Sequence, residues 1–328
     1  MSTAGAAAPR APAPPLRTRP RDTSASWPLL DRIGLAFCWA AGIALCVIAA
    51  TILIYMAIKG VQYLRPELLF SRPEVAVDQS GTGGFLDPLA GTLLIVTVAM
   101  AIALPLGLVV AVWLTEYGRP LGLARAVEAG VEIIAGTPSI VLAIFGLIVF
   151  QESFFGFLSF EAAGGSVFGR SFLTAGATMS LIALPLVVGA TREALQAVPN
   201  HLREASFALG KTRISTIRRV LLPAVRPGIA TGTVLGAGRV IGDTAIIVVL
   251  LGATARLEAG DGPTGIDTLR GTGSTLTSYV YNNSPVGEGN APEKAYAAAC
   301  VLLLIAILLN SLVTRIAKGR RGGAAWIT

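Results

Sequence analysis

The sequence predicts an all-α membrane protein, a polytopic bundle of about six transmembrane helices. Hydrophobic residues make up 53% of the 328 residues, charged residues only 14%, and the mean hydropathy is +0.69. A water-soluble core cannot hide that much apolar surface. A bilayer core of roughly 30 Å needs about 20 helical residues, and apolar stretches of this length recur. We expect spans near residues 33–58, 89–115, 131–151, 171–191, 228–251 and 293–316.

Composition divides the chain into four segments. Residues 1–28 are rich in Ala, Pro and Arg, which predicts a disordered tail. Residues 29–88 hold the first span and an outer loop, and residues 89–318 hold the other spans together with loop 192–227. Residues 319–328 form a short basic tail that can touch anionic membrane lipid.

The positions of the basic residues predict the orientation in the membrane. Of the 26 Lys and Arg, 18 lie in residues 1–32 and 315–328 and in loops 116–130 and 192–227. Seven lie on the opposite side, and Arg239 lies inside a span. By the positive-inside rule, both termini and loop 192–227 are cytoplasmic. The net charge of +7 therefore reflects topology, and without an aromatic-interleaved basic patch we expect no nucleic-acid partner.

The third predicted span is interrupted near its start. Pro138 breaks a helix, and with Gly136 it predicts a structural hinge. The neighbouring hydroxyls of Thr137 and Ser139 have two interpretations. They either line a passage for a hydrated anion or satisfy the backbone of a Pro-kinked helix.

Loop 192–227 predicts two short helices that form a lever on the membrane surface. The first helix covers residues 201–209, with Asn200 as its cap and Gly210 as its stop. A second, basic helix follows, and Pro223 is expected to end it and to act as a structural hinge. An ordinary interfacial helix is the alternative, but such a helix requires neither a Gly at its end nor a Pro after the segment that follows. One face of the first helix carries Leu202, Ala205, Ser206 and Leu209, while Arg203 and Glu204 point elsewhere.

Arg239 and Asp243 stand four residues apart in an otherwise apolar span. This spacing predicts a pair on one helical face, where charges at membrane depth are expensive and mark a functional site. A planar guanidinium suits phosphate, and a paired carboxylate keeps it oriented. A structural ion pair that fixes helix packing is the other interpretation.

Several of these motifs resemble ABC-transporter permeases. Glu204-Ala-Ser206, Gly210 and Leu221-Leu-Pro223 are similar to the EAA loop, which reads E-A-A, three residues, G and a later I-x-L-P. Gly136-Thr-Pro-Ser-Ile-Val141 resembles the G-T-P-S-I-V signature of phosphate-type permeases, and Thr115-Glu-Tyr117 also fits them. Arg239-Val-Ile-Gly-Asp-Thr244 is similar to R-x-x-G-E-T, with Asp for Glu. Tyr279-Val-Tyr-Asn282 resembles PstA-like subunits, whereas Arg226-Pro-Gly and Leu235-Gly-Ala-Gly238 resemble PstC-like ones.

The resemblance implies the type I ABC importer permease fold and a phosphate permease subunit in a bacterial cytoplasmic (inner) membrane. Its partners would be a separate ATP-binding subunit at the cytoplasmic loop, a second, PstC-like permease and an extracytoplasmic phosphate-binding protein. The chain has no G-x-x-x-x-G-K-[ST] motif, so we expect the partner to use ATP and this chain to bind no cofactor. Coupling would involve Arg203, Glu204, Ala205, Ser206 and Gly210, and the substrate pathway Arg239, Asp243, Thr137 and Ser139.

Three alternatives remain open. In the first, the transported anion is molybdate or sulfate instead of phosphate, because charge does not separate these oxyanions. In the second, the chain is the PstC-like subunit instead of the PstA-like one. A different class, an intramembrane enzyme, is disfavoured because the single His201 lies in the loop and the spans hold no Ser–His, paired-Asp or metal cluster. We therefore expect no catalytic residue and no metal site.

Overall fold

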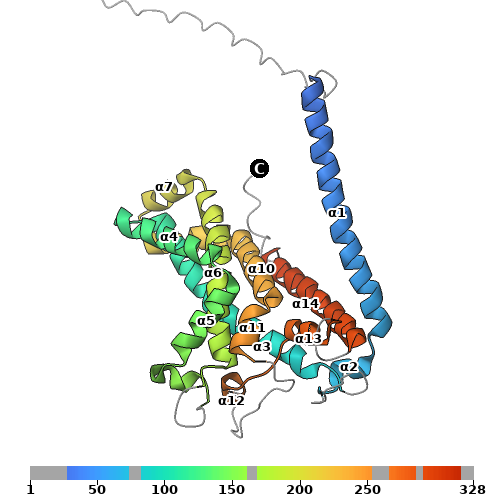
Figure 1. Cartoon of the computed structure of the whole chain (residues 1–328). Coiled ribbons are helices and arrows are strands. Elements are labelled where there is room, and N and C mark those ends of the chain that lie inside the picture. The colour runs from blue at the N-terminus through green and yellow to red at the C-terminus, as the bar shows by residue number, and fades with distance from the viewer. Residues whose placement is uncertain (1–27, 74–82, 161–167, 253–265, 286–290, 319–328) are drawn as a thin grey trace, which may run out of the picture. The chain divides into compact units, whose positions relative to one another are not determined.

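The computed structural model describes residues 28–73, 83–160, 168–252, 266–285 and 291–318 (Figure 1). Every element in these ranges is a helix, which confirms the all-α prediction. Four helices are long and apolar enough to cross a membrane, or up to six if each of two bent helix pairs counts as one span. The tail predicted to be disordered lies outside the described residues except for Pro28, and the tail at 319–328 lies outside them entirely.

The chain forms two compact units, residues 1–55 and residues 56–328. The described part of the first unit is the start of α1 (Leu29–Tyr63), a 35-residue helix that is longer than the predicted span 33–58. The last turns of α1 belong to the second unit. There Gly60 lies directly against Cys300 of α14 (Pro292–Lys318), where any side chain at position 60 would clash.

Three helices form the centre of the second unit: α3 (Leu86–Val112), α6 (Phe172–Gln196) and α10 (Arg226–Gly242). Glycines allow these helices to approach closely. A Cβ atom at Gly107 of α3 would lie 2.7 Å from Cγ1 of Val187 in α6, and one at Gly176 of α6 would meet Val98 of α3. Gly232 of α10 faces Val187 in the same way. Tight packing at two levels therefore joins α3 and α6 along their lengths.

The first bent pair is α4 (Leu121–Gly136) with α5 (Ser139–Phe150), which meet at 109°. The bend lies at Thr137 and Pro138, where the sequence predicts an interruption. The prediction that 116–130 is a loop is wrong, because residues 121–130 belong to α4. The predicted span 131–151 is divided by the bend into the end of α4 and α5. Residues 121–136 form an amphipathic helix, because their Ala, Leu and Glu favour helix and place charged side chains on one face. An ion pair between Arg192 of α6 and Glu128 joins α4 to the centre of the unit.

The second bent pair follows α7 (Asn200–Ala208). It consists of α8 (Arg213–Thr216), the π-helix η4 (Ile217–Leu221) and α9 (Leu222–Ala224), bent by 69° from α10 at Val225. Pro223 lies in the first turn of α9, just before this bend. The α7 helix and α4 lie at one end of the unit, and α12 (Ile266–Arg270) lies at the other (Figure 1).

Short helices also lie between the long ones. These are α2 (Pro66–Phe70), which follows α1, and α12 and α13 (Leu276–Asn283), which lie between α11 and α14. The η3 helix (Ser153–Leu158) follows α5, and α11 (Ala245–Leu250) follows α10. Thr275 starts α13 with a capping box, in which its hydroxyl accepts from the Ser278 N–H.

Candidate functional site

The stop of α7 has the conformation that its sequence predicts. Gly210 has φ +73°, in the left-handed region, and its N–H donates to the Phe207 carbonyl at 2.9 Å. The next N–H, of Lys211, donates to the Ser206 carbonyl at 3.2 Å. A Cβ atom at Gly210 would meet nothing within 4 Å. Glycine is therefore needed here for its backbone conformation and not for space.

The start of α7 differs from the prediction. Pro199 occupies the N-cap position with φ −60° and ψ 140°, and Asn200 is the first helical residue. No side chain caps the helix; instead the Asn200 Oδ1 accepts a hydrogen bond from Arg203 at 3.2 Å. The prediction of an Asn cap is wrong because the fixed φ of proline sets the helix start one residue earlier.

The predicted small-residue face of α7 lines an open groove of about 240 Å³ between α7 and the α8–η4 segment. The hydroxyls of Ser206 and Thr216 lie 2.8 Å apart at the buried base, so α7 and α8 are held together. Leu209 is 79% exposed, which leaves an apolar side chain open to a partner. The lining residues are Leu202, Ala205, Ser206, Leu209, Lys211, Ser215, Arg219 and Val220.

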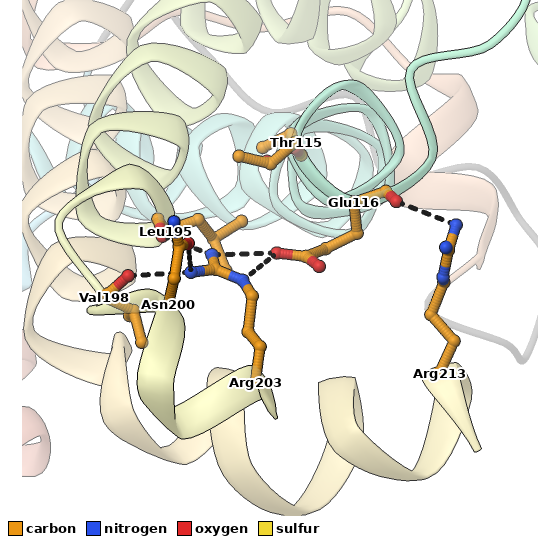
Figure 2. Close-up of polar contacts among 8 residues, drawn as sticks. Thr115, Glu116, Leu195, Val198, Asn200, Arg203 and Arg213 are labelled. Atoms are coloured by element: carbon orange, nitrogen blue, oxygen red, sulfur yellow. Dashed lines mark hydrogen bonds and ion pairs between the residues drawn. The ribbon is translucent and has the colours of Figure 1, made fainter. Parts of the chain in front are cut away.

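Arg203 points away from the groove and into the protein (Figure 2). Its Nε and Nη2 donate to one oxygen of Glu116, Oε1, at 3.1 and 3.0 Å. The same guanidinium donates to the carbonyls of Leu195 at 2.9 Å and Val198 at 2.7 Å, at the end of α6. The side chains of Arg203 and Glu116 are 17% and 9% exposed. One half-buried guanidinium therefore joins three chain segments.

Glu116 lies in η2 (Trp113–Tyr117), a π-helical continuation of α3. It is held from a second side, because Nη1 of Arg213 in α8 donates to the Glu116 carbonyl at 3.1 Å (Figure 2). The Arg213 guanidinium also lies 5.4 Å from the ring centre of Tyr117. Glu116 is not among the residues predicted for the site, although the Thr115-Glu-Tyr117 motif contains it.

Glu204 and Ala205 remain on the outside of α7, and both are exposed. Within the described residues, Glu204 takes part in no ion pair. The five residues predicted for coupling thus divide in the structure. Glu204 and Ala205 are exposed, Ser206 holds α7 to α8, Gly210 ends the helix, and Arg203 reaches inward.

Arg239 and Asp243 do not form the predicted pair. The α10 helix ends at Gly242, and Asp243 has an extended backbone with ψ 133°, so the two residues do not share a helical face. The buried Asp243 carboxylate accepts the Ile246 N–H at 2.9 Å and thereby caps α11. Arg239 is exposed and has no ion-pair partner in the described ranges. The prediction of a paired, buried site is wrong because the carboxylate satisfies a helix start instead.

Thr137 and Ser139 flank the 109° bend and are half-buried. The Thr137 hydroxyl donates to the Ile133 carbonyl at 2.7 Å, one turn back in α4. This contact satisfies the last turn of α4 next to Pro138, as the structural interpretation of these hydroxyls requires. Ser139 is the first residue of α5.

Together the fold and this end of the bundle define a multi-pass helical membrane protein with a structured loop braced against its central helices. The chain belongs to the family of binding-protein-dependent transport system inner membrane components, whose profile matches residues 103–322. It is therefore a permease subunit of an ABC importer.

Two curated relatives and one solved structure are similar to this chain. The chain is 34% identical over 242 residues to phosphate transport system permease protein PstA 1 of Mycobacterium tuberculosis, covering 73% of this chain and 72% of the relative. It is 27% identical over 245 residues to the permease protein PstC of Mesorhizobium japonicum, covering 71% and 72%. A bacterial alginate ABC transporter solved with its periplasmic protein superposes with a TM-score of 0.60 at 17% identity, over 89% of this chain and 97% of that one. This last likeness supports the fold alone.

Proposed function

We propose that this chain is the PstA-like permease subunit of an importer that moves inorganic phosphate across the bacterial cytoplasmic membrane. The supporting observation is the 34% identity, over 73% of the chain, to a relative named as a phosphate transport permease. The second permease subunit is PstC-like, and an extracytoplasmic binding protein delivers the anion. ATP is bound and hydrolysed by a separate subunit.

The ATP-binding subunit docks on the groove of α7, α8 and η4. The groove offers an apolar lining with the exposed Leu209, and two of its lining residues, Lys211 and Arg219, are basic. It therefore suits an apolar knob flanked by acidic side chains. The exposed Glu204 carboxylate next to the groove offers a contact for a basic side chain of the same partner.

Arg239 is the anion contact in the pathway. An exposed guanidinium in an apolar helix is expensive in lipid, so in the assembly it faces either the second permease or a wet path. Its planar donor fork suits a phosphate group. Asp243 acts indirectly, because it caps α11 and so fixes the break that follows Arg239. Ser139 and Thr137 keep a place in the pathway as residues at the bend of the α4–α5 pair.

The orientation follows the positive-inside rule, with both termini and the α7 end in the cytoplasm. Cysteine labelling tests it in a background that lacks Cys38, Cys46 and Cys300, the three free cysteines. A membrane-impermeant maleimide on intact cells should label Tyr281→Cys, whose position in α13 is 61% exposed, and should not label Ala208→Cys in α7. Labelling of Ala208→Cys alone would reverse the topology.

The substrate is tested with the complete importer in proteoliposomes, made of both permeases, the ATPase and the binding protein. Labelled phosphate should accumulate on the side of the membrane that carries the ATPase, and only when ATP is present on that side. A large excess of molybdate or sulfate should compete weakly with phosphate uptake. Stronger competition by either anion than by unlabelled phosphate would assign the importer to that oxyanion. Arg239→Lys, which keeps the charge without the fork, should retain partial uptake.

A further inference from the structure

We propose that Glu116, in η2 at the end of α3, is a positioning residue that makes loop 192–227 and this span move as one body. We call loop 192–227 the coupling loop. This inference rests on the proposed function, because it assigns how the docked ATPase reaches the membrane helices. We call the contacts of Glu116 with Arg203 and Arg213 the loop brace. The brace joins η2 to α7 through one arginine and to α8 through the other.

The Glu116 carboxylate is held in a fixed position by Arg203. Two N–H groups of Arg203 converge on its Oε1 at 3.0 and 3.1 Å, in surroundings that leave the carboxylate side chain only 9% exposed. Charge-assisted hydrogen bonds in such a setting are short and directional. Because the guanidinium also donates to the Leu195 and Val198 carbonyls, it has little freedom to rotate away. The link is therefore stiff.

The end of α3 has an unusual helical conformation next to Glu116. The helix does not end as an α-helix but widens into a π turn over Trp113–Tyr117, where the Gly118 N–H donates to the Trp113 carbonyl at 2.8 Å. A π turn contains one more residue than an α turn and so changes the direction of the side chains in it and after it. Gly118 then ends the π-helix in the left-handed conformation, with φ +45°. In this turn the Glu116 side chain faces Arg203 of α7, and the Glu116 carbonyl faces Arg213 of α8 (Figure 2).

The segments on both sides of the loop brace are themselves tightly packed. The α3 span packs tightly on α6 through Gly107 and Gly176, so a displacement applied at Glu116 is carried along the helix pair. Ser206 and Thr216 hold the two loop helices together on the other side of the brace. A movement of the docking groove is therefore passed to α3 through Glu116 and not absorbed within the loop.

A distance measurement tests the brace without any transported substrate. Nitroxide labels are placed at Val109→Cys on α3 and Ala208→Cys on α7, two exposed positions, in a background without the native cysteines. In the assembled importer the distance between the labels should be the same without nucleotide and with ATP bound. In Glu116→Ala it should change between the two states, and Glu132→Ala, which removes an exposed carboxylate from α4, should behave like the wild type. Equal distance changes with and without Glu116 would overturn the inference.

Transport provides the functional measurement. Phosphate moved per ATP hydrolysed, in assembled complexes only, should fall about fivefold or more in Glu116→Ala, the scale of a typical coupling between sites. Glu116→Gln keeps an acceptor oxygen and should fold well, with an intermediate loss. A lower yield of complex with an unchanged ratio would show that Glu116 only supports folding. If the wild type moves no phosphate, the proposed substrate fails, and the label distances alone decide the role of Glu116.

Discussion

Two pairs of opposite charges behave in opposite ways in this protein. Glu116 and Arg203 are 87 positions apart in the chain, yet they meet at 3.0 Å in a partly buried setting. Arg239 and Asp243 are four positions apart in one apolar segment, yet one is exposed and the other caps a different helix. Sequence spacing therefore indicated the wrong pair, because proximity depends on where each helix ends.

The difference has a physical cause in the two helix termini. The end of α10 frees the backbone N–H groups at the start of α11, and the short Asp243 side chain satisfies one of them. The end of α6 frees carbonyl groups, and the long Arg203 side chain reaches two of them together with the Glu116 carboxylate. Each charge is committed to a helix end, and only in the second case is the opposite charge also within reach.

The largest expected effect concerns the partly buried pair of Arg203 and Glu116. Arg203→Met leaves the Glu116 carboxylate and two carbonyls without this donor, which should destabilise the subunit by about 1.5–3 kcal/mol. The measurement is the thermal unfolding midpoint of the purified subunit in detergent. Arg218→Met serves as the control, because Arg218 is exposed and forms no ion pair with any described residue. Equal midpoints for the two variants would mean that the pair adds nothing to stability.

The next effect concerns the stop of α7. Gly210→Val forces a β-branched side chain into the left-handed conformation, at about 1–2 kcal/mol or more. The spans should still insert, while assembly with the ATPase or ATP hydrolysis stimulated by the loaded binding protein should fail. Gly210→Asn is the matched control, since Asn tolerates this conformation and a side chain here meets no neighbour within 4 Å. Normal stimulation in Gly210→Val would reduce the loop to an ordinary interfacial helix.

A smaller effect is expected at the cap of α11. Asp243→Leu removes the acceptor of the Ile246 N–H and should destabilise the subunit by about 1 kcal/mol, whereas Asp243→Asn keeps an acceptor and should cost less. Unfolding midpoints of the two variants provide the comparison. An equal loss for Asn and Leu would indicate that the negative charge, and not the acceptor for the Ile246 N–H, provides the stabilisation.

The smallest effect on stability is expected at Arg239. Arg239→Met should change the unfolding free energy by no more than about 0.5 kcal/mol, because no described partner loses a contact. Uptake of phosphate should nevertheless be lost. Combined with Asp243→Leu, its effect on stability should be additive, as for residues that do not touch. Normal uptake at normal abundance in Arg239→Met would remove this residue from the pathway.

Hydropathy and punctuation residues predicted much of the fold. The long apolar runs indicated the four helices that can cross a membrane, and Gly210 marked the end of α7 with the backbone conformation that it adopts. The same reasoning placed the cap of α7 on Asn200 and treated the start of α4 as a loop, because helix starts depend on neighbours as well as on propensity. The small-residue face of α7 was predictable from helical periodicity, and in the structure it lines the groove.

The partner of Arg203 was not predictable in this way. Glu116 lies at a π turn, which has no reliable signature in a single sequence, and its contact joins segments 87 positions apart. The Thr115-Glu-Tyr117 motif was visible, but only the fold brings it beside α7. Long-range contacts of this kind follow from how α3, α6 and the loop pack and not from any local pattern.

The central claim is that Glu116 and Arg203 act as one unit in coupling, and a double-mutant cycle tests it most directly. Phosphate moved per ATP hydrolysed is measured in assembled importers that carry Glu116→Gln, Arg203→Met or both substitutions. If the two side chains act only through each other, the double variant should be no worse than Arg203→Met alone. Losses that multiply in the double variant would show that the residues act independently and would contradict the account.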